Sequence, residues 1–349
     1  MNILALNSGS SSFKFGLFRV DASHVETLLS ETVSSAGHEE VVSRVVSVFA
    51  RPGVPAPDVI GHRIVHGGPK LRQHGVINDT VLRQLEAAAV FAPLHMPAAL
   101  ALIRFAQQRF PGLPQVACFD TRFHAGLPDV ARVLPIAKEL QAQGIQRYGF
   151  HGLSLESIVR QLGNDLPQRV VIAHLGNGAS VTAVKGGQSI DTSMGLTPTG
   201  GLIMGTRSGD LDPGVLIHLL REKQFDAARL EALVDHGSGL LGISGVSSDM
   251  RLLHEAAASN PDARLAIEMF CYAVRKQIAA MIAVLDGIDL LVFTGGIGEN
   301  DAEVRAAICS GLSWAGIDPA GDGASGSVQV IESQEDEQIA RHAWALVAA

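Results

Sequence analysis

The chain has 349 residues, 47% of them hydrophobic, which is too long for one ordinary core and suits two domains. Its 27 basic and 35 acidic residues give a net charge of −8, and the basic residues form no stripe along the sequence. We therefore do not expect it to bind nucleic acid. The N-terminus lacks a signal-peptide pattern, and the most apolar late stretch (278–293) is too short and too interrupted to cross a membrane, so we expect a cytoplasmic protein without membrane contact. The three cysteines lack metal-like spacing, and we expect buried thiols.

The first predicted element is a β-hairpin at the N-terminus. An apolar run, residues 3–6, enters the polar turn 7–12, and an alternating strand follows over residues 13–18. The turn contains four serines, and Lys14 comes directly after it. Backbone N–H groups with short hydroxyls and a lysine suit phosphate oxygens, whereas an exposed hairpin turn is the alternative.

The same design returns near the middle of the chain. An apolar run, residues 170–173, enters a Gly/Asn/Ser turn over residues 174–180, and an alternating strand leaves it toward Lys185. Two such hairpins, each opening about half of the chain, predict an internal duplication of whole domains. The repetition favours phosphate binding by both turns.

A third glycine-rich turn, residues 294–300, follows a predicted strand at 290–293 and precedes a predicted helix at 302–312. This arrangement lets a backbone approach a nucleotide closely. The P-loop ending is absent, and the GGIG segment lacks the spacing of a Rossmann fingerprint. Further predicted elements are a strand at 59–62 after a Pro-rich loop, a Gly/Ser turn at 321–327 before a strand at 328–331, and a last helix at 335–348.

Ten segments resemble motifs of the acetate kinase family and occur in the family's order. A single match could arise by chance, but ten matches in order are specific for the family. They are NSGSSSFKF (7–15), HRIVHGG (62–68), APLHMP (92–97), CFDTRFH (118–124), RYGFHG (147–152), HLGNGAS (174–180), DTSMGLTP (191–198), MGTRSGDLDPG (204–214), SGLLGISGVSSDMR (238–251) and FTGGIGEN (293–300).

The resemblance implies an α/β fold with two duplicated actin-like, ribonuclease H-like domains and the nucleotide in the cleft between them. Residues 1–150 would form the first domain, which holds the acceptor site and is capped by the C-terminal helix 335–349. Residues 151–334 would form the second, with the nucleotide site and the contact of a homodimer. The apolar residues of segment 265–285 exceed what one helix face needs, which fits either full burial or such a contact.

The implied reaction is reversible transfer of the γ-phosphoryl group of ATP to acetate, giving acetyl phosphate and ADP, with Mg²⁺ or in its place Mn²⁺. Such a transfer needs positioning and charge neutralisation more than covalent help. Propionate or another short carboxylate is the alternative acceptor. A nucleotide-binding sensor without turnover is the non-enzymatic alternative, although it would not need the acceptor arginine.

By resemblance, the catalytic residues are Asp120, His151 and Arg207. Arg63 would pair with the substrate carboxylate, beside a small apolar pocket of Val65, Leu94, Phe150 and Pro198. Mg²⁺ would be held by Asn7 and Glu335. The nucleotide would contact Lys14, His174, Leu175, Gly176, Asn177, Gly178, Asp249, Met250, Arg251, Gly296, Ile297, Gly298, Glu299 and Asn300.

Several of these roles have structural alternatives. Arg63 could form an internal ion pair, Arg207 could lie in a surface loop, and the pocket residues could serve the core as well. Asp336 and Glu337 follow Glu335 directly, so the metal ligand could shift by one position, or the acidic helix start could simply be solvated. The acceptor carboxylate is already ionised near neutral pH, so Asp120 is not needed as a general base.

Four more histidines in these motifs, His66, His95, His124 and His174, are expected to have supporting or structural roles. The chain is a few dozen residues shorter than usual family members, mostly between residues 18 and 59. Met96, Leu153 and Leu155 also depart from the family pattern. These differences leave open which acyl chain is preferred.

Overall fold

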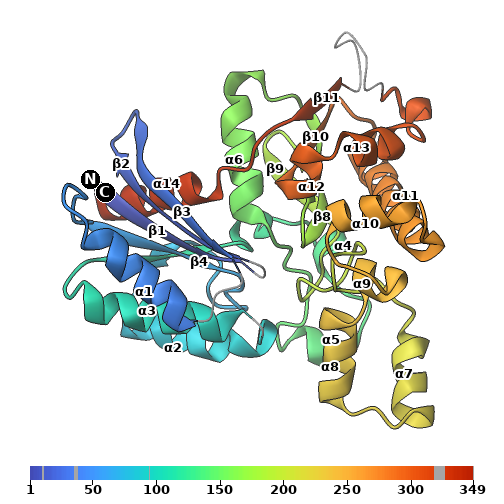
Figure 1. The fold of residues 1–349 in the computed structure, drawn as a ribbon, viewed down its shortest axis with the longest axis horizontal. Helices are drawn as coiled ribbons and strands as arrows, with labels where there is room; N and C mark the ends of the chain where they lie inside the picture. Colours follow the sequence, from blue (N-terminus) through green and yellow to red (C-terminus); the bar gives the residue numbers. More distant parts are fainter. Residues whose placement is uncertain (10–11, 35–37, 94, 318–326, 349) are drawn as a thin grey trace. The chain divides into compact units, whose positions relative to one another are not determined.

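The computed structural model describes residues 1–9, 12–34, 38–93, 95–317 and 327–348, and the chain divides into two compact units. Unit 1 consists of Met1–Ala125, Phe150–Gln161 and Gln334–Ala349. Unit 2 consists of Gly126–Gly149 and Leu162–Ser333. The units therefore interleave along the chain, whereas the sequence analysis drew one boundary at residue 150 (Figure 1).

Unit 1 is built on a mixed sheet with the strand order β3-β2-β1-β4-β6-β5. Its strands are β1 (Asn2–Ser8), β2 (Ser12–Val20), β3 (Val25–Ser34), β4 (Val59–Ile64), β5 (Gly75–Val76) and β6 (Gln115–Phe119). The first three strands pair antiparallel as two hairpins, and β4 and β6 extend the sheet in parallel to β1. The short β5 closes the edge in antiparallel pairing with β6.

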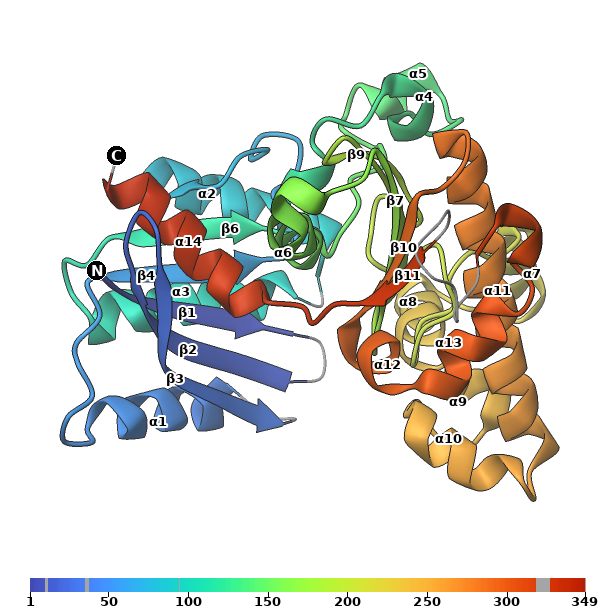
Figure 2. The ribbon, with the colours of Figure 1, turned by 90° about the horizontal axis from the view of Figure 1, so that it is seen from above.

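Alternation along β1 divides the core of unit 1 between the two faces of the sheet, because successive strand side chains point to opposite sides. Leu4 and Leu6 belong to one cluster, together with residues of α1 (His38–Phe49) and α3 (Met96–Arg109). Ile3 and Ala5 belong to the other, together with residues of α6 (Gly152–Leu162) and α14 (Glu335–Ala348). Helix α14 packs along β1, β4, β2 and β6, so the last helix of the sequence covers the first strand (Figure 2). The remaining helix of this unit is α2 (Asp79–Ala88).

Unit 2 repeats this plan with the strand order β9-β8-β7-β10-β11. Its strands are β7 (Arg169–Leu175), β8 (Ala179–Lys185), β9 (Gln188–Thr192), β10 (Leu290–Thr294) and β11 (Ser327–Val330). Strands β7 to β9 form the antiparallel meander, and β10 and β11 follow in parallel to β7. Strands β1, β2, β3, β4 and β6 of unit 1 have the same order and pairing directions. The two sheets confirm the predicted duplication.

The helices of unit 2 precede its first strand or lie in the connections between its strands. They are α4 (Asp129–Arg132), α5 (Lys138–Gln141), α7 (Pro213–Glu222), α8 (Ala227–His236), α9 (Gly239–Ser244), α10 (Met250–Ala257), α11 (Pro261–Leu285), α12 (Gly295–Asn300) and α13 (Ala302–Cys309). Short 3₁₀ turns lie at Ala89–Phe91, Arg122–His124, Gly163–Asp165 and Ser313–Ala315.

Three local predictions need correction. The glycine-rich segment 295–300, predicted as a turn, forms the short helix α12, in which the Glu299 carboxylate satisfies the N–H of Gly295. Helix α13 ends at Cys309, three residues before the predicted end. Strand β4 continues to Ile64, so Arg63 lies within it. Most of the predicted turn 321–327 lies outside the described residues.

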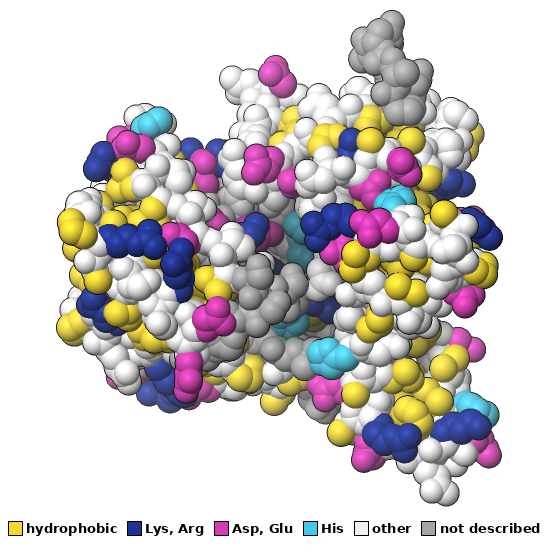
Figure 3. Space-filling view, viewed as in Figure 1, with side chains coloured by type: hydrophobic (Ala, Val, Ile, Leu, Met, Phe, Trp, Pro, Cys, Tyr) yellow, Lys and Arg dark blue, Asp and Glu magenta, His cyan; other side chains and the backbone are white. Residues whose placement is uncertain are grey.

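The surface carries mixed charges. Basic and acidic side chains are interspersed over the face seen in Figure 3. Cys118, Cys271 and Cys309 are buried. Over the described ranges, none of the helices combines the length and the hydropathy that crossing a membrane would require.

Candidate active site

Arg63 and Asp120 form a buried ion pair in unit 1. Arg63 projects from β4, and Asp120 follows β6, whose ladder continues through an N–H···O bond of 3.0 Å from Asp120 to Ile64. The Arg63 Nε lies 3.1 and 3.0 Å from the two carboxylate oxygens, and its Nη2 lies 2.6 Å from Oδ2. The two side chains are 11% and 1% exposed. Parallel neighbouring strands thus bring together two residues predicted for the same site.

Opposing effects act on the protonation of this pair. Burial alone would lower the pKa of Arg63, but the charges of Asp120 and Glu335 raise it above its usual value. Burial raises the pKa of Asp120, and the Arg63 charge and hydrogen bonds oppose that shift. The close bidentate geometry keeps both groups ionised at neutral pH.

His151 occupies a strained backbone position beside Asp120. Its φ angle is 61°, in the left-handed region that non-glycine residues rarely adopt. The next residue, Gly152, donates its N–H to the Asp120 carbonyl at 2.8 Å, and a Cβ there would lie 2.2 Å from the same oxygen. Only glycine permits this approach. The turn therefore holds the predicted catalytic residues His151 and Asp120 in one place, and His151 is 7% exposed.

A group of oxygen-bearing side chains meets at the end of β1. The Asn7 amide nitrogen donates to Glu335 Oε2 at 3.0 Å and to Asp336 Oδ1 at 2.7 Å, both in the first turn of α14. The Asn7 Oδ1 accepts from Arg63 Nη1 at 3.3 Å. Lys14 lies opposite Asn7 in the β1–β2 register, with an exposed side chain. Both predicted metal ligands are thus together, and Asp336 joins them.

The predicted pocket residues are divided between the units. Val65 and Phe150 are buried in unit 1. Two histidines contact Phe150. The His124 Nε2 lies 2.9 Å from the Phe150 carbonyl oxygen, and the His66 and Phe150 rings are in edge contact with their centroids 5.5 Å apart. Pro198 is buried in unit 2. Leu94 lies outside the described residues.

In unit 2, the second hairpin turn packs against the loop that carries Arg207. Residues 176–178 connect β7 to β8, so the turn is shorter than the predicted 174–180, and it is closed by a 2.9 Å bond from the Gly176 N–H to the Gly178 carbonyl. The Gly205 N–H donates to the Asn177 carbonyl at 3.1 Å, and a Cβ on Gly205 would lie 2.4 Å from Asn177 Oδ1. The absence of a side chain at Gly205 allows this close packing.

Arg207 is a buried cation whose side chain is held by its own loop. It is 7% exposed, and its Nη1 donates to the Pro198 carbonyl at 3.1 Å. The loop is fastened on its other side to α8, where Asp235 accepts from Thr199 through its carboxylate and from Thr206 through its carbonyl. A surface-loop arginine would not be enclosed in this way.

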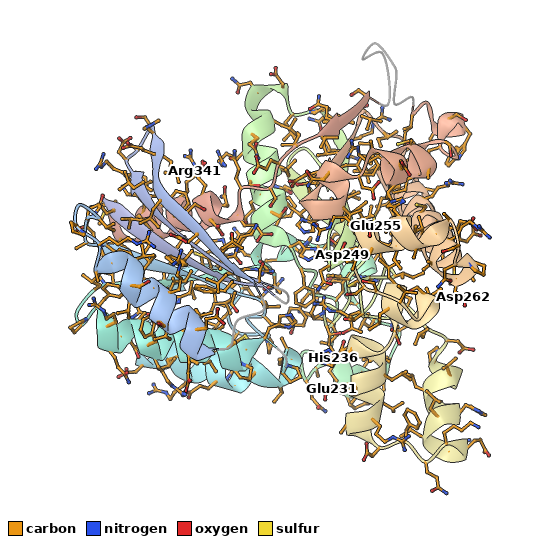
Figure 4. All side chains as sticks on the ribbon, viewed as in Figure 1. Glu231, His236, Asp249, Glu255, Asp262 and Arg341 are labelled. Atoms are coloured by element: carbon orange, nitrogen blue, oxygen red, sulfur yellow. The ribbon has the colours of Figure 1, made fainter. Side chains whose placement is uncertain are left out.

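The remaining predicted nucleotide residues lie at the start of α10 and along the short helix α12. Asp249 caps α10, accepts from the Arg251 backbone at 2.9 Å and pairs with the Arg251 side chain at 2.6 Å (Figure 4). Met250 is buried. In α12, Glu299 accepts from the N–H groups of Gly295 and Ser333 at 2.8 and 3.0 Å.

The members of α12 differ in what they can offer a nucleotide. Glu299 uses its carboxylate to shape the loop around α12. Gly296 and Asn300 are exposed, Gly298 is buried, and Ile297 is intermediate. The Asn300 amide donates to the Gly296 carbonyl at 2.9 Å. Gly296 and Asn300 are therefore the exposed members of this predicted set, and the Glu299 carboxylate is hydrogen-bonded within unit 2.

Comparisons with known proteins identify the family of this chain. The sequence profile of the Acetokinase family matches residues 31–340. The chain belongs to this family. An acetate kinase of a Synechococcus strain is 42% identical, over 91% of this chain and 88% of its own.

Solved structures of the acetokinase family have the same fold. A propionate kinase from Francisella tularensis has a TM-score of 0.89 at 35% identity, covering 99% of this chain and 100% of its own. An acetate kinase from Porphyromonas gingivalis has a TM-score of 0.86 at 32% identity, covering 99% of both chains. The family and the duplicated actin-like fold, both predicted from the sequence, are confirmed.

The residues at the end of β1 fit a hard divalent cation. The Asn7 amide and the Glu335 and Asp336 carboxylates can offer oxygen ligands, which Mg²⁺ prefers over nitrogen or sulfur. Burial raises the pKa of Asp336, and the neighbouring Glu335 charge adds to this shift. Three acidic groups near one buried arginine leave negative charge that a cation would neutralise.

The structure adds residues to the predicted acetokinase site. Asp336 entered the sequence analysis only as an alternative register for Glu335, but both side chains reach Asn7. Asp235 was not singled out, since a lone aspartate in a helix carries no motif. Asp235 is recognised by its hydrogen bonds to Thr199 and Thr206 of the Arg207 loop, which are apparent only in the folded structure.

Proposed function

We propose that this chain catalyses the reversible transfer of the γ-phosphoryl group of ATP to acetate. A carboxylate oxygen of acetate forms a bond to the γ-phosphorus, the bond from that phosphorus to the β–γ bridging oxygen breaks, and acetyl phosphate and ADP result. The observation that carries the proposal is the buried Arg63–Asp120 pair beside Asn7, Glu335 and Asp336, in a chain of the acetokinase family.

Unit 1 would provide the acceptor site. Arg63 would attract the acetate carboxylate, a role that its planar guanidinium fills better than a lysine. In the structure that guanidinium holds Asp120, so we infer that Asp120 orients Arg63 for the incoming anion. No proton has to be removed from acetate, and Asp120 therefore acts as a charge and an orienting group. His151 would donate a hydrogen bond to an oxygen of the transferring phosphoryl group.

Unit 2 would provide the donor site. Residues 174–178 and the backbone of α12 would bind the phosphates of ATP, and the start of α10 at Asp249, with Met250 and Arg251, would bind elsewhere on the nucleotide. Arg207 would stabilise the negative charge that develops in the transition state, which enclosed, preorganised cations do effectively. Asn7 and Glu335, with Asp336, would hold Mg²⁺, which supplies charge neutralisation for the β- and γ-phosphates. Lys14 would approach the phosphates from β2.

Propionate is the second candidate acceptor, because a propionate kinase is among the similar structures. One methylene changes binding in an apolar pocket by only about 1–3 kcal/mol. By family resemblance, Val65, Leu94, Phe150 and Pro198 are the residues that we propose to set the preference. A comparison of kcat/KM for acetate, propionate and butyrate separates the two candidates.

A hydroxamate trap for acyl phosphate tests the proposal directly. Purified protein with ATP, Mg²⁺, acetate and hydroxylamine should produce acetyl hydroxamate. The Arg63→Ala variant should not produce it, whereas the surface control Arg19→Ala should. Omission of acetate controls for ATP hydrolysis. If the wild-type chain forms no acyl hydroxamate with any short carboxylate, the proposed function is wrong.

We also propose that the chain works as a homodimer in the cytoplasm. Leu265, Met269 and Tyr272 form an exposed stripe along α11, with 46%, 37% and 61% exposure, whereas the opposite face of this helix is buried. Residues at this spacing share one side of a helix, and such a stripe fits a self-complementary contact. Three buried thiols are compatible with a reducing compartment.

A further inference from the structure

Three titratable side chains from separate elements of unit 1 meet beside the C-terminal helix. Glu156 lies on α6, His342 on α14, and His74 directly before β5. The His342 Nε2 lies 2.6 Å from Glu156 Oε2, and the His74 Nε2 lies 3.6 Å from the same oxygen. The two imidazole rings are 4.0 Å apart, and all three side chains are at least three-quarters buried.

Such a trio has the composition of a zinc site, and its candidate ligand atoms all lie within 4.8 Å of one another. The protonation of His74 argues against that function. The Phe119 N–H donates to His74 Nδ1 at 3.0 Å, so the proton of the neutral ring is on Nε2. A metal would need the lone pair at that position, and ligating histidines usually donate from their other nitrogen. The cluster is therefore an anion held between two imidazoles.

The carboxylate of Glu156 depends on this arrangement. Burial raises its pKa, but the nearby imidazoles of His342, at 2.6 Å, and His74, at 3.6 Å, outweigh burial and lower it to about 2. Glu156 thus stays ionised while it links α6 to α14. The Gln338 amide, one turn before His342, lies 3.0 Å from the same imidazole nitrogen.

A second contact between the same helices lies one turn further along α6. The Arg160 guanidinium reaches Gln334 Oε1 at 2.6 Å, Gln338 Oε1 at 3.0 Å and Glu337 Oε1 at 3.1 Å. The Gln334 N–H donates to Ser157 Oγ at 3.1 Å. Two positions along α14 are therefore fixed to α6. Arg160 contacts residues 334–338, and Glu156 contacts residue 342. We call these contacts the α6–α14 seam.

Both helices of the seam begin at residues of the candidate site. Helix α6 starts directly after His151, and α14 starts at Glu335. His342 is seven residues from Glu335, a rise of about 10 Å along the helix axis. A slip of one residue would rotate α14 by about 100° and take Glu335 and Asp336 away from Asn7. Contacts at two heights prevent such a slip.

We propose that Glu156 and Arg160 are positioning residues, which fix α14 on α6 so that Glu335 and Asp336 remain at Asn7 for the metal. The inference rests on the proposed function for the identity of that metal. Loss of an outer partner of a metal ligand typically weakens metal binding by about 10–100-fold. The seam is made by neighbours of Glu335 and Asp336 along the chain and not by these ligands themselves, and about a tenfold effect is expected.

The test is direct binding of Mn²⁺, followed by electron paramagnetic resonance of the free ion, in the full chain without substrates. Glu156→Gln and Arg160→Met should each weaken Mn²⁺ binding about tenfold, and Arg160→Lys should restore part of it. The same variants should raise the KM for Mg²⁺ more than they lower kcat. Arg341→Met is the matched control, because Arg341 pairs with Glu337 within α14 itself (Figure 4).

Clear results would overturn the inference. Unchanged Mn²⁺ binding in folded Arg160→Met would do so, even if Glu156→Gln failed to fold. Equal losses in Arg341→Met would show general weakening of α14 instead of positioning. Stoichiometric Zn²⁺ binding that His342→Ala abolishes would make the trio a metal site. Acetyl phosphate formation by the wild type is measured alongside, so that a failure of the proposed function is seen separately.

Discussion

Replacement of Arg63 by alanine gives the sharpest test of the acceptor site. The change removes three hydrogen bonds to Asp120 and those to Asn7 and the Ser8 carbonyl. It leaves a carboxylate that is 1% exposed without its counter-ion. Breaking one side of a buried ion pair costs about 3–5 kcal/mol, so the free energy of unfolding should fall by about 4 kcal/mol near pH 8.

The pH dependence of this loss provides an internal check. Without Arg63, burial keeps the Asp120 pKa above its unfolded value, so the folded state favours the neutral acid. The loss of stability should therefore be small near pH 4 and grow as the pH rises through the folded pKa. Urea unfolding at pH 5 and pH 8 measures this difference.

A double-mutant cycle separates the ion pair from other effects of the substitution. Asp120→Asn in the Arg63→Ala background removes the orphaned charge and should recover about half of the loss. The control Arg19→Ala breaks an exposed pair with Glu26, at 2.7 Å and about half exposed, and should cost less than about 1 kcal/mol. If Arg63→Ala costs no more than this control and Asp120→Asn restores nothing, the assignment of a coupled pair fails.

Three further outcomes are expected. Arg207→Ala should lower kcat/KM for phosphoryl transfer at least about a hundredfold, and near wild-type efficiency would remove Arg207 from the transition state. Burial lowers the pKa of His62 to about 4 despite its bond to Gln115, so the unfolded chain binds the proton more tightly. Stability should then be complete above pH 6.5 and fall by up to about 3 kcal/mol toward pH 4, a slope that His62→Gln should flatten in urea titrations. Sedimentation at micromolar concentration should give twice the 36.7 kDa chain mass, and a monomer would exclude the proposed dimer.

Local patterns predicted the repeated frame of the fold because strand alternation and polar turns are short-range signals. Both hairpins, the strands predicted at 59–62 and 290–293 and the start of α14 at Glu335 follow from such patterns. The segment 295–300 did not, since glycines favour turns and the stabilising contact comes from Glu299 within a formed helix. The interleaving of the units also lacks a local signal, because it depends on where α6 and α14 find apolar partners.

The candidate site depended more on family resemblance than on the residues alone. Asn7 and Glu335 are 328 positions apart in the sequence, and no spacing rule connects them. The resemblance named Arg63 and Asp120 but not their mutual ion pair, which arises because β4 and β6 are neighbours. Nor did it indicate the α6–α14 seam, whose contacts exist only after both helices have packed on the sheet.

The position of α14 has a consequence for the order in which the protein is made. Residues 1–125 leave the ribosome early, but Ile339, Ala340 and Ala343 of their core follow more than 200 residues later. At about 5–20 residues per second, translation of the intervening segment takes about 10–40 s. During that time the apolar face formed by Ile3 and Val59 lacks its covering helix. The nascent N-terminal segment should therefore bind chaperones, and the proposed metal site cannot form before α14 is synthesised.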